Sequence, residues 1–180
     1  VFCIVIFLYN FFTRNYVNPY KLIFVFGKKG SGKSTLLTKL AYKYRKRGWH
    51  VYTTEQLPGT FDIKEPKQIF NIWFPEKSCI FIDEVSLIWD NRDFKSMDKR
   101  VVEWFRYQRH HKCRVYFFSQ TFDIDKKLRD LADDMYLVNK YFRVFIKLHI
   151  LPPNRWSLVR QSNSDSSCAR PARRPSERWG

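Results

Sequence analysis

The stretch that decides the fold is residues 21–37, KLIFVFGKKGSGKSTLL. It begins with a short apolar run, residues 21–26, of the kind that forms a strand buried on both faces. From residue 33 to 47 the apolar residues recur at helical spacing, and Gly48 follows where a C-terminal cap belongs. The loop between strand and helix, GKKGSGKST, fits the spacing GxxxxGK[ST]. The sequence therefore predicts a strand, a phosphate-binding loop and a helix in succession.

The loop has the residue types that hold phosphate groups. Glycines let the backbone close around phosphate oxygens, and N–H groups at the helix N-terminus point at the anion. We expect Lys33 to reach the β- and γ-phosphates of ATP and Ser34 to ligate Mg²⁺. The full set expected to bind nucleotide is Gly27, Lys28, Lys29, Gly30, Ser31, Gly32, Lys33, Ser34 and Thr35. The alternative is a glycine-rich turn that holds no ligand.

Two further strands end in residues that complete such a site. Residues 78–84, SCIFIDE, place Asp83 after an apolar run, where it would hold the Mg²⁺ shell. Glu84 follows, and we expect the strand pleat to turn its side chain away from that of Asp83. There it would polarise an attacking water, which favours hydrolysis, although a solvated strand end is the alternative. Residues 113–121 end in SQT, so Ser119 or Gln120 would emerge beside the γ-phosphate, and Gln120 is our choice as its sensor.

The remaining pattern alternates strands and helices. We expect strands at 49–54, 78–84, 113–121, 135–138 and 141–150, and helices at 97–111 and 126–132. Residues 55–78 carry three prolines and are expected to form loops around a short helix near 67–74. Such alternation predicts an α/β fold of three layers, a RecA-like P-loop NTPase with a mainly parallel central sheet flanked by helices. We assign residues 21–153 to this domain.

The two ends differ from the body in composition. Residues 1–12, VFCIVIFLYNFF, are mostly apolar, so we interpret residues 1–20 as part of a membrane anchor, with a buried strand or helix as the alternative. Basic residues follow the apolar run, which would leave the body in the cytoplasm. Residues 154–180 are rich in Arg, Ser and Pro and are expected to be disordered. That tail is either a basic arm for phosphate backbones or an incidental end.

The chain is strongly basic, with a net charge of +16. This charge points to an acidic partner, which would be nucleic acid, an anionic lipid surface or both, and a well-solvated basic surface is the alternative. Residues 106–114, RYQRHHKCR, concentrate basic side chains, and Arg109 could act on a neighbouring subunit's γ-phosphate as an arginine finger. The alternatives are an exposed basic helix end or, less favoured, a metal site at His110 and His111. The four cysteines show no paired spacing, so neither a zinc site nor a disulfide framework is expected.

Taken together, GKKGSGKST, FIDE and RYQRHHKCRVYFFSQTFDIDKKLRDLAD resemble one family. They are similar to the N-terminal domain of zonular occludens toxin and the related filamentous-phage assembly ATPases, near the FtsK–HerA group. The part most specific to this family is a series in chain order. It consists of the pair Arg109-His110, a predicted strand, Gln120, Ile124-Asp125 and residues 128–131. The family commonly has Gly and Asp where this chain has Lys112 and Arg114, and nothing after Pro153 is apolar enough for the family's membrane span. The toxin activity in the family's name therefore has no support here.

The resemblance implies an ATPase at the bacterial inner membrane that drives assembly and export of filamentous phage. It implies ATP and Mg²⁺ as cofactors, a homo-oligomer, and inner-membrane assembly proteins of phage or host as partners. Single-stranded DNA and an anionic membrane surface are further candidate partners. The alternatives are an FtsK/HerA-type DNA translocase or packaging ATPase, and a nucleotide-binding interaction module without turnover. A small-molecule kinase is least favoured, because residues 55–78 show no basic lid.

Overall fold

The structure is a computed structural model that describes residues 4–6, 8–9, 18–89, 98–121, 126–141 and 145–151. Its strands form one sheet in the order β3-β2-β4-β5-β1-β6-β7. The pairs are parallel except β6 with β7, which run antiparallel. The strands are β1 (Leu22–Phe26), β2 (His50–Thr53), β3 (Phe61–Asp62), β4 (Ser78–Ile82), β5 (Cys113–Ser119), β6 (Asp134–Tyr141) and β7 (Phe145–Leu151). The prediction of a mainly parallel sheet is confirmed.

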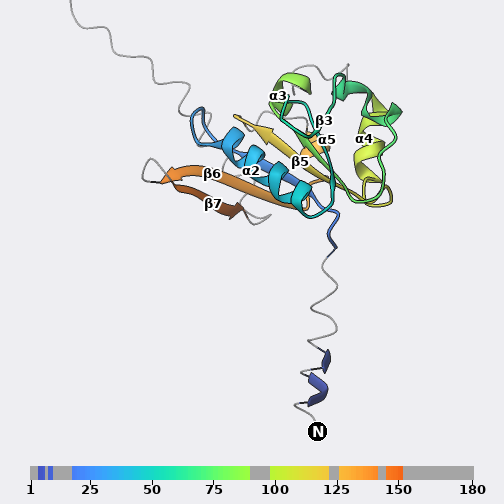
Figure 1. The fold of residues 1–180 in the computed structure, drawn as a ribbon, viewed down its shortest axis with the longest axis vertical. Coiled ribbons are helices and arrows are strands. Elements are labelled where there is room, and N and C mark those ends of the chain that lie inside the picture. The colour runs from blue at the N-terminus through green and yellow to red at the C-terminus, as the bar shows by residue number, and fades with distance from the viewer. Residues whose placement is uncertain are drawn as a thin grey trace, which may run out of the picture.

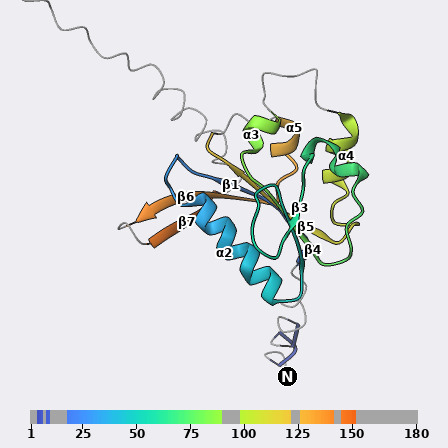
Figure 2. The ribbon, with the colours of Figure 1, turned by 45° about the horizontal axis from the view of Figure 1, so that its top comes forward.

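Helices cover both faces of the sheet and make three layers (Figures 1 and 2). One face is covered by α2 (Lys33–Lys46), which packs on the side chains of Ile23 and Val25. The other face is covered by the 3₁₀ helix η1 (Pro66–Asn71), α3 (Val85–Ile88), α4 (Lys99–Arg106) and α5 (Lys126–Arg129). Successive residues of β1 therefore go to opposite layers, as expected for a strand buried on both faces.

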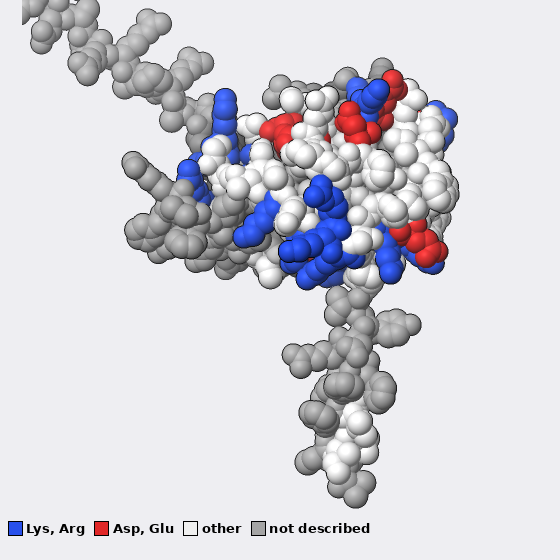
Figure 3. All heavy atoms as spheres, viewed as in Figure 1, with Lys and Arg blue, Asp and Glu red and all other residues white. Residues whose placement is uncertain are grey.

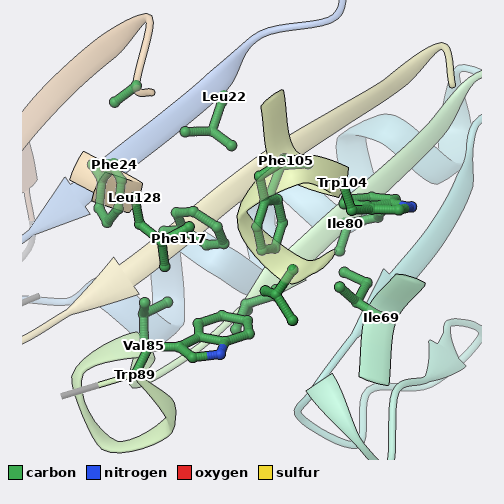
Figure 4. Close-up of a cluster of buried hydrophobic side chains, with 14 of the residues drawn as sticks. Leu22, Phe24, Ile69, Ile80, Val85, Trp89, Trp104, Phe105, Phe117 and Leu128 are labelled. Atoms are coloured by element: carbon green, nitrogen blue, oxygen red, sulfur yellow. The ribbon is translucent and has the colours of Figure 1, made fainter. Parts of the chain in front are cut away.

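The larger core lies under η1, α3, α4 and α5 (Figure 4). Its centre is aromatic: the ring of Phe117 lies 4.8 Å from that of Phe24 and 4.9 Å from that of Phe105. All three side chains are fully buried. Rings that meet at tilted and edge-on angles add roughly 0.5–1.5 kcal/mol per pair beyond their buried area. This packing holds β5 against its neighbour β1 within the sheet and against α4, which covers that face of the sheet.

Several elements differ from their predicted bounds: β6 is longer than the strand predicted at 135–138, and β7 begins later than the strand predicted at 141–150. The helix expected at 97–111 is α4, which ends at Arg106, and residues 107–112 form turns instead. Trp104 explains part of this difference, because its indole stacks on the His111 ring at 5.6 Å and draws the chain back. The short elements β3 and α3 fall in segments where the sequence pattern predicted no regular element.

The two ends are described only in part. Residues 4–6 and 8–9 are helical, and residues 154–180 lie outside the described residues, so the expected disorder of that tail stays a prediction. Among the residues that the structure describes, no helix is both long and apolar enough to cross a membrane. Ile124-Asp125, part of the resemblance, also lies outside them. Of the four cysteines, the structure describes Cys79 and Cys113, and both are free and buried.

Candidate nucleotide site

The predicted phosphate loop joins the end of β1 to the start of α2. Gly30 and Gly32 have φ of 77° and 94°, in the left-handed region that glycine adopts most readily. Gly32 is the N-cap of α2, and no side chain caps the helix there, nor does the first turn carry an acidic residue. The first N–H groups of a 14-residue helix are therefore left for a ligand. Together with the positive end of the helix dipole, they favour an anion at this point.

Gly27 and Ser31 show how tightly the loop is wound. A Cβ at Gly27 would lie 2.4 Å from Ser31 Oγ and 2.9 Å from the backbone oxygen of Val138 in β6. No side chain larger than hydrogen fits between those atoms without moving the loop. Ser31 Oγ is itself buried and has no hydrogen-bond partner among the described residues. A buried hydroxyl inside a phosphate-type loop is suited to donate a hydrogen bond to an anion.

Lys33 turns back into the loop. Its Nζ donates to the backbone oxygen of Gly27 at 2.8 Å and, more weakly, to that of Lys28 at 3.4 Å. The side chain is only 7% exposed, so its charge sits at the centre of the loop. Because a lysine amine has three donor hydrogens, it can exchange these carbonyl oxygens for phosphate oxygens. This is the role predicted for Lys33.

The carboxylates Asp83 and Glu84 follow β4 at the same edge of the sheet. The Asp83 N–H donates to Thr54 Oγ1 at 3.0 Å, and Asp83 Oδ1 accepts from the Glu84 N–H at 2.9 Å. The strand ends at Ile82, so the pleat does not separate the two side chains as the sequence pattern predicted. Glu84 instead has φ of 48° and ψ of 48°, a left-handed turn that begins α3. Left-handed backbone in a residue other than glycine is costly and typical of functional turns.

Gln120 and Glu84 meet at the carboxyl-terminal edge of the sheet, where β5 and β4 are neighbours. The sequence predicted Gln120 beside the γ-phosphate on condition that these two strands are neighbours, and its role as the phosphate sensor stays a prediction. Gln120 Nε2 donates to Glu84 Oε1 at 2.6 Å across the ends of neighbouring strands β5 and β4. Ser119, the other candidate, is fully buried, and its hydroxyl is bonded to the backbone of Thr121. Of the two residues, only Gln120 is therefore available to a ligand. Since β5 lies between β1 and β4, it stands between the phosphate loop and the carboxylates.

The sequence interpretation missed Thr54 and Glu55, at the end of β2. Glu55 shares a side-chain hydrogen bond with Asp83, which, with burial and the charges of Asp83 and Glu84, raises the pKa of Glu55 to about 7. Two carboxyl groups that share a bond hold a proton more tightly than either would alone. The signal was present in the residues TTE directly after an apolar strand. The sequence pattern places Thr54 at the end of the strand predicted at 49–54 and Glu55 in the proline-containing loop that follows, and it gives neither residue a role in the site.

Arg109, the candidate arginine finger, lies at the opposite edge of the sheet. It forms an ion pair with Asp133, whose other oxygen accepts from the Leu22 N–H at 2.8 Å. Leu22 starts β1 and the phosphate loop follows its end, so about 13 Å of strand separates Arg109 from the site. Within one chain the structure does not bring Arg109 to the nucleotide. Its action on a neighbouring subunit stays a prediction.

The histidines of the basic segment have structural neighbours. His111 stacks on Trp104, and the His110 ring lies 5.8 Å from that of Tyr107. Lys112 forms an ion pair with Glu76. Within the described part of the chain, no group of three or more His, Cys, Asp or Glu side chains is placed to hold a metal ion. The less favoured metal site at His110 and His111 therefore gains no support.

Comparison with known proteins agrees with this geometry. Residues 13–151 match the family described as Novel STAND NTPase 3. The chain belongs to this family. The match includes every residue of the phosphate loop and both carboxylates, so the NTPase assignment rests on the segment that builds the site. No curated protein sequence gave a significant match.

Solved structures share the fold of this NTPase. The N-terminal domain of zonular occludens toxin from Neisseria meningitidis is 17% identical with a TM-score of 0.56, over 79% of this chain and 90% of that one. The flagellar accessory protein FlaH from Methanocaldococcus jannaschii is also 17% identical with a TM-score of 0.56, over 73% of this chain and 77% of that one. The genome packaging NTPase B204 from Sulfolobus turreted icosahedral virus 2, in complex with ATP-gammaS, is 14% identical with a TM-score of 0.55, over 85% and 88%. The structural resemblance to the toxin domain is thus confirmed at the level of fold.

The residues of this NTPase fit a nucleotide and its magnesium ion. The uncapped helix end, the buried amine of Lys33 and the buried hydroxyl of Ser31 suit phosphate oxygens. Ser34 is exposed on the first turn of α2, and Asp83 directly follows β4, which β5 separates from β1. A hydroxyl and one carboxylate are the protein ligands that Mg²⁺ takes beside phosphate and water. Both metal ligands stay predictions, as does the role of each loop residue.

Proposed function

We propose that this chain is a Mg²⁺-dependent ATPase that works as an oligomeric motor in filamentous-phage assembly and export at the bacterial inner membrane. The observation that carries the ATPase part is the bond between Gln120 and Glu84 beside the phosphate loop. A loop that only bound nucleotide would not need a glutamate and an amide aligned across two strand ends. Such a pair is suited to holding a water molecule at the terminal phosphate.

The chemistry follows from the residues in hand. Lys33 and the N–H groups of α2 would neutralise the charge that grows on the phosphate oxygens during transfer. Asp83 and Ser34 would hold Mg²⁺, which supplies further charge neutralisation when bound. Glu84 would orient and polarise the attacking water once its bond to Gln120 is exchanged for that water. Gln120 can donate and accept at once, so it would then report whether phosphate or water fills the position.

The phage role rests on likeness rather than on the site. The segment from Arg106 to Asp133 resembles filamentous-phage assembly ATPases in sequence, and the fold is that of a zonular occludens toxin domain. The net charge of +16 suits a protein that handles DNA or lies on an anionic membrane. Inner-membrane assembly proteins, single-stranded DNA and further copies of this chain are the partners we propose.

Activity measurements on purified protein test the ATPase part. We expect phosphate release that needs Mg²⁺, and we expect Lys33→Ala to lose nucleotide binding and turnover together. Glu84→Gln should keep nucleotide affinity within about threefold but lower kcat at least about 100-fold, because it removes only the group that acts on water. Equal turnover in wild type and Lys33→Ala would refute the assigned site.

A second candidate is a DNA-packaging or translocating ATPase. It is favoured by the likeness to the packaging NTPase B204, which covers slightly more of this chain than the toxin domain does. Hydrolysis stimulated by double-stranded DNA, and not by membrane assembly proteins, would select this function. Nucleotide binding without turnover at any protein concentration would instead select an interaction module.

A further inference from the structure

We propose that the amino-terminal edge of the sheet is a lipid-binding surface, through which the domain lies on an anionic membrane. We call this surface the basic edge. Its charged residues directly precede or begin β1, β2, β4, β5 and β6: Lys21, Lys46, Arg47, Glu76, Lys77, Arg109, Lys112, Arg114, Asp133 and Asp134. The inference rests on the membrane location proposed above and names the part of the molecule that would face the lipid.

The parallel sheet brings these residues together. His50 of β2 pairs with Ser78 of β4, and Ser78 pairs with Cys113 of β5, so the strands begin side by side. Helix α2 runs from the phosphate loop towards this edge and ends there in Lys46 and Arg47. Figure 3 shows Lys and Arg side chains gathered over that end of α2. The nucleotide site lies at the opposite, carboxyl-terminal edge.

The chain enters the domain through the same edge. Arg114 donates to the backbone oxygen of Pro19 at 2.9 Å, and Gln108 Nε2 donates to that of Tyr20 at 3.3 Å. The Tyr20 ring also lies 6.0 Å from that of Trp49. These contacts place the entry of the chain into the domain at this edge. We therefore expect a membrane that takes up the preceding apolar segment to lie near the basic edge.

The edge carries an excess of positive charge. It has seven Lys and Arg side chains against three carboxylates, a net of four positive charges. Three cations are neutralised in ion pairs: Lys21 with Asp134, Arg109 with Asp133 and Lys112 with Glu76. Lys46, Arg47 and Lys77 are exposed and have no carboxylate partner in the described part of the chain. At the opposite edge the three lysines of the phosphate loop, Lys28, Lys29 and Lys33, are matched in number by Glu55, Asp83 and Glu84, which follow β2 and β4.

The apolar residues before the edge favour lipid over nucleic acid as the occupant. In the described part of residues 1–9, the side chains of Ile4, Val5, Ile6, Leu8 and Tyr9 are 46–69% exposed. A nucleic-acid surface needs basic groups and stacking rings but gains nothing from exposed aliphatic side chains. An anionic membrane interface accepts both features, because acyl chains take up aliphatic groups and lipid phosphates attract nearby Lys and Arg.

Vesicle sedimentation with the full chain tests this surface. Vesicles of phosphatidylcholine with about 30% phosphatidylglycerol are compared with pure phosphatidylcholine, and the anionic vesicles should bind more tightly. The variant Lys46→Gln/Arg47→Gln/Lys77→Gln removes the three exposed cations of the edge that have no carboxylate partner in the described part of the chain. The fourth such cation, Arg114, is half-buried and donates to the backbone of Pro19, so it is left in place. Since each cation near an anionic surface contributes about fivefold, we expect binding to anionic vesicles to weaken on the order of 100-fold. Binding to neutral vesicles should not change.

The matched control is Lys64→Gln/Lys67→Gln/Lys99→Gln, which removes the same charge from exposed positions away from the edge. It should leave vesicle binding within about threefold of wild type, as expected for charges more than a Debye length away. Equal losses in both variants would overturn the proposal, as would equal wild-type binding to anionic and neutral vesicles. Loss of oligonucleotide binding in the edge variant, with vesicle binding kept, would assign the edge to nucleic acid instead.

A separate readout distinguishes this inference from the proposed function. ATP hydrolysis in the edge variant should equal that of wild type, because none of its three residues touches the nucleotide site. Lys33→Ala should lose turnover but keep vesicle binding. A chain that binds anionic vesicles and hydrolyses nothing would therefore refute the ATPase alone, whereas the reverse result would refute the lipid surface alone.

Discussion

Ser31 gives the most direct test of the phosphate loop, because its hydroxyl is buried and has no partner among the described residues. A buried hydroxyl without a hydrogen bond costs about 1–3 kcal/mol relative to water. Replacing Ser31 by Ala removes that cost from the ligand-free protein. We therefore expect Ser31→Ala to raise the free energy of unfolding by about 1 kcal/mol, which corresponds to about 2–4 °C in Tm for a domain of this size.

The same change should weaken nucleotide binding. If the hydroxyl donates to a phosphate oxygen, its loss costs about 1.5–3 kcal/mol, or roughly 10- to 100-fold in the Kd for ATP. Differential scanning fluorimetry without nucleotide and calorimetric titration with it measure the two effects separately. The opposite signs of the two effects are the specific expectation, because replacing a serine whose hydroxyl has an ordinary structural role would lower the stability of the ligand-free protein.

Ser78 is the matched control. It is also a fully buried serine, but its Oγ donates to the backbone oxygen of Pro75 at 2.6 Å. Ser78→Ala should therefore lower the free energy of unfolding by about 1–2 kcal/mol and leave nucleotide affinity unchanged. A lower Tm for ligand-free Ser31→Ala, or an unchanged Kd, would show that the loop does not hold its ligand as argued.

Three further predictions concern the carboxylates and the basic segment. Gln120→Ala should lower kcat about tenfold or more with nucleotide affinity unchanged, because Glu84 loses the amide that aligns it; an unchanged kcat would remove Gln120 from the site. Asp133→Asn should lower the free energy of unfolding by about 1–3 kcal/mol in chemical denaturation, because the Leu22 N–H and the Arg109 guanidinium lose a charged acceptor. Arg109→Gln should lower the free energy of unfolding less. If Arg109→Gln instead loses turnover without losing stability, that result would favour the arginine finger. The pKa of Glu55 is about 7 in the folded chain against 4.5 for a free glutamate, so the unfolded chain releases this proton first as pH rises. The free energy of unfolding should therefore fall as pH rises from 4.5 to about 7. Glu55→Gln should be more stable than wild type at pH 8, and the difference should shrink towards pH 5; a constant difference would contradict the shared bond with Asp83.

The parts of the site that could be predicted from the sequence depend on residues that are close together in the chain or follow the ends of parallel strands. The phosphate loop could be predicted from the sequence because its strand, loop and helix follow one another within residues 21–46. The helix dipole that favours an anion there arises from this helix alone and depends on no residue distant in the sequence. The meeting of Gln120 with Glu84 could be expected because parallel strands end at one edge. It required only that β5 and β4 be neighbours, which the pairing confirms.

The parts that were not predictable depend on long-range pairing. Glu55 joins the site only because β2 pairs with β4, a register that no local pattern contains. We predicted a role for Arg109 from the basic residues next to it in the sequence, whereas its ion-pair partner Asp133 lies 24 residues further along the chain. The turn of Glu84 into left-handed backbone is likewise set by the packing of α3 under the sheet.

The bond from Lys33 to the carbonyl of Gly27 has a kinetic consequence. The loop is closed around the Lys33 amine, so a nucleotide does not have to order it and meets a preformed shape. Binding is then an exchange, in which phosphate oxygens replace backbone oxygens on the same amine. Release runs the exchange backwards, and the carbonyl takes the amine back as the product leaves. Such an internal competitor would favour repeated turnover. The same three N–H hydrogens of Lys33 bind the phosphate oxygens of a nucleotide and, when the product leaves, bind the backbone oxygens again.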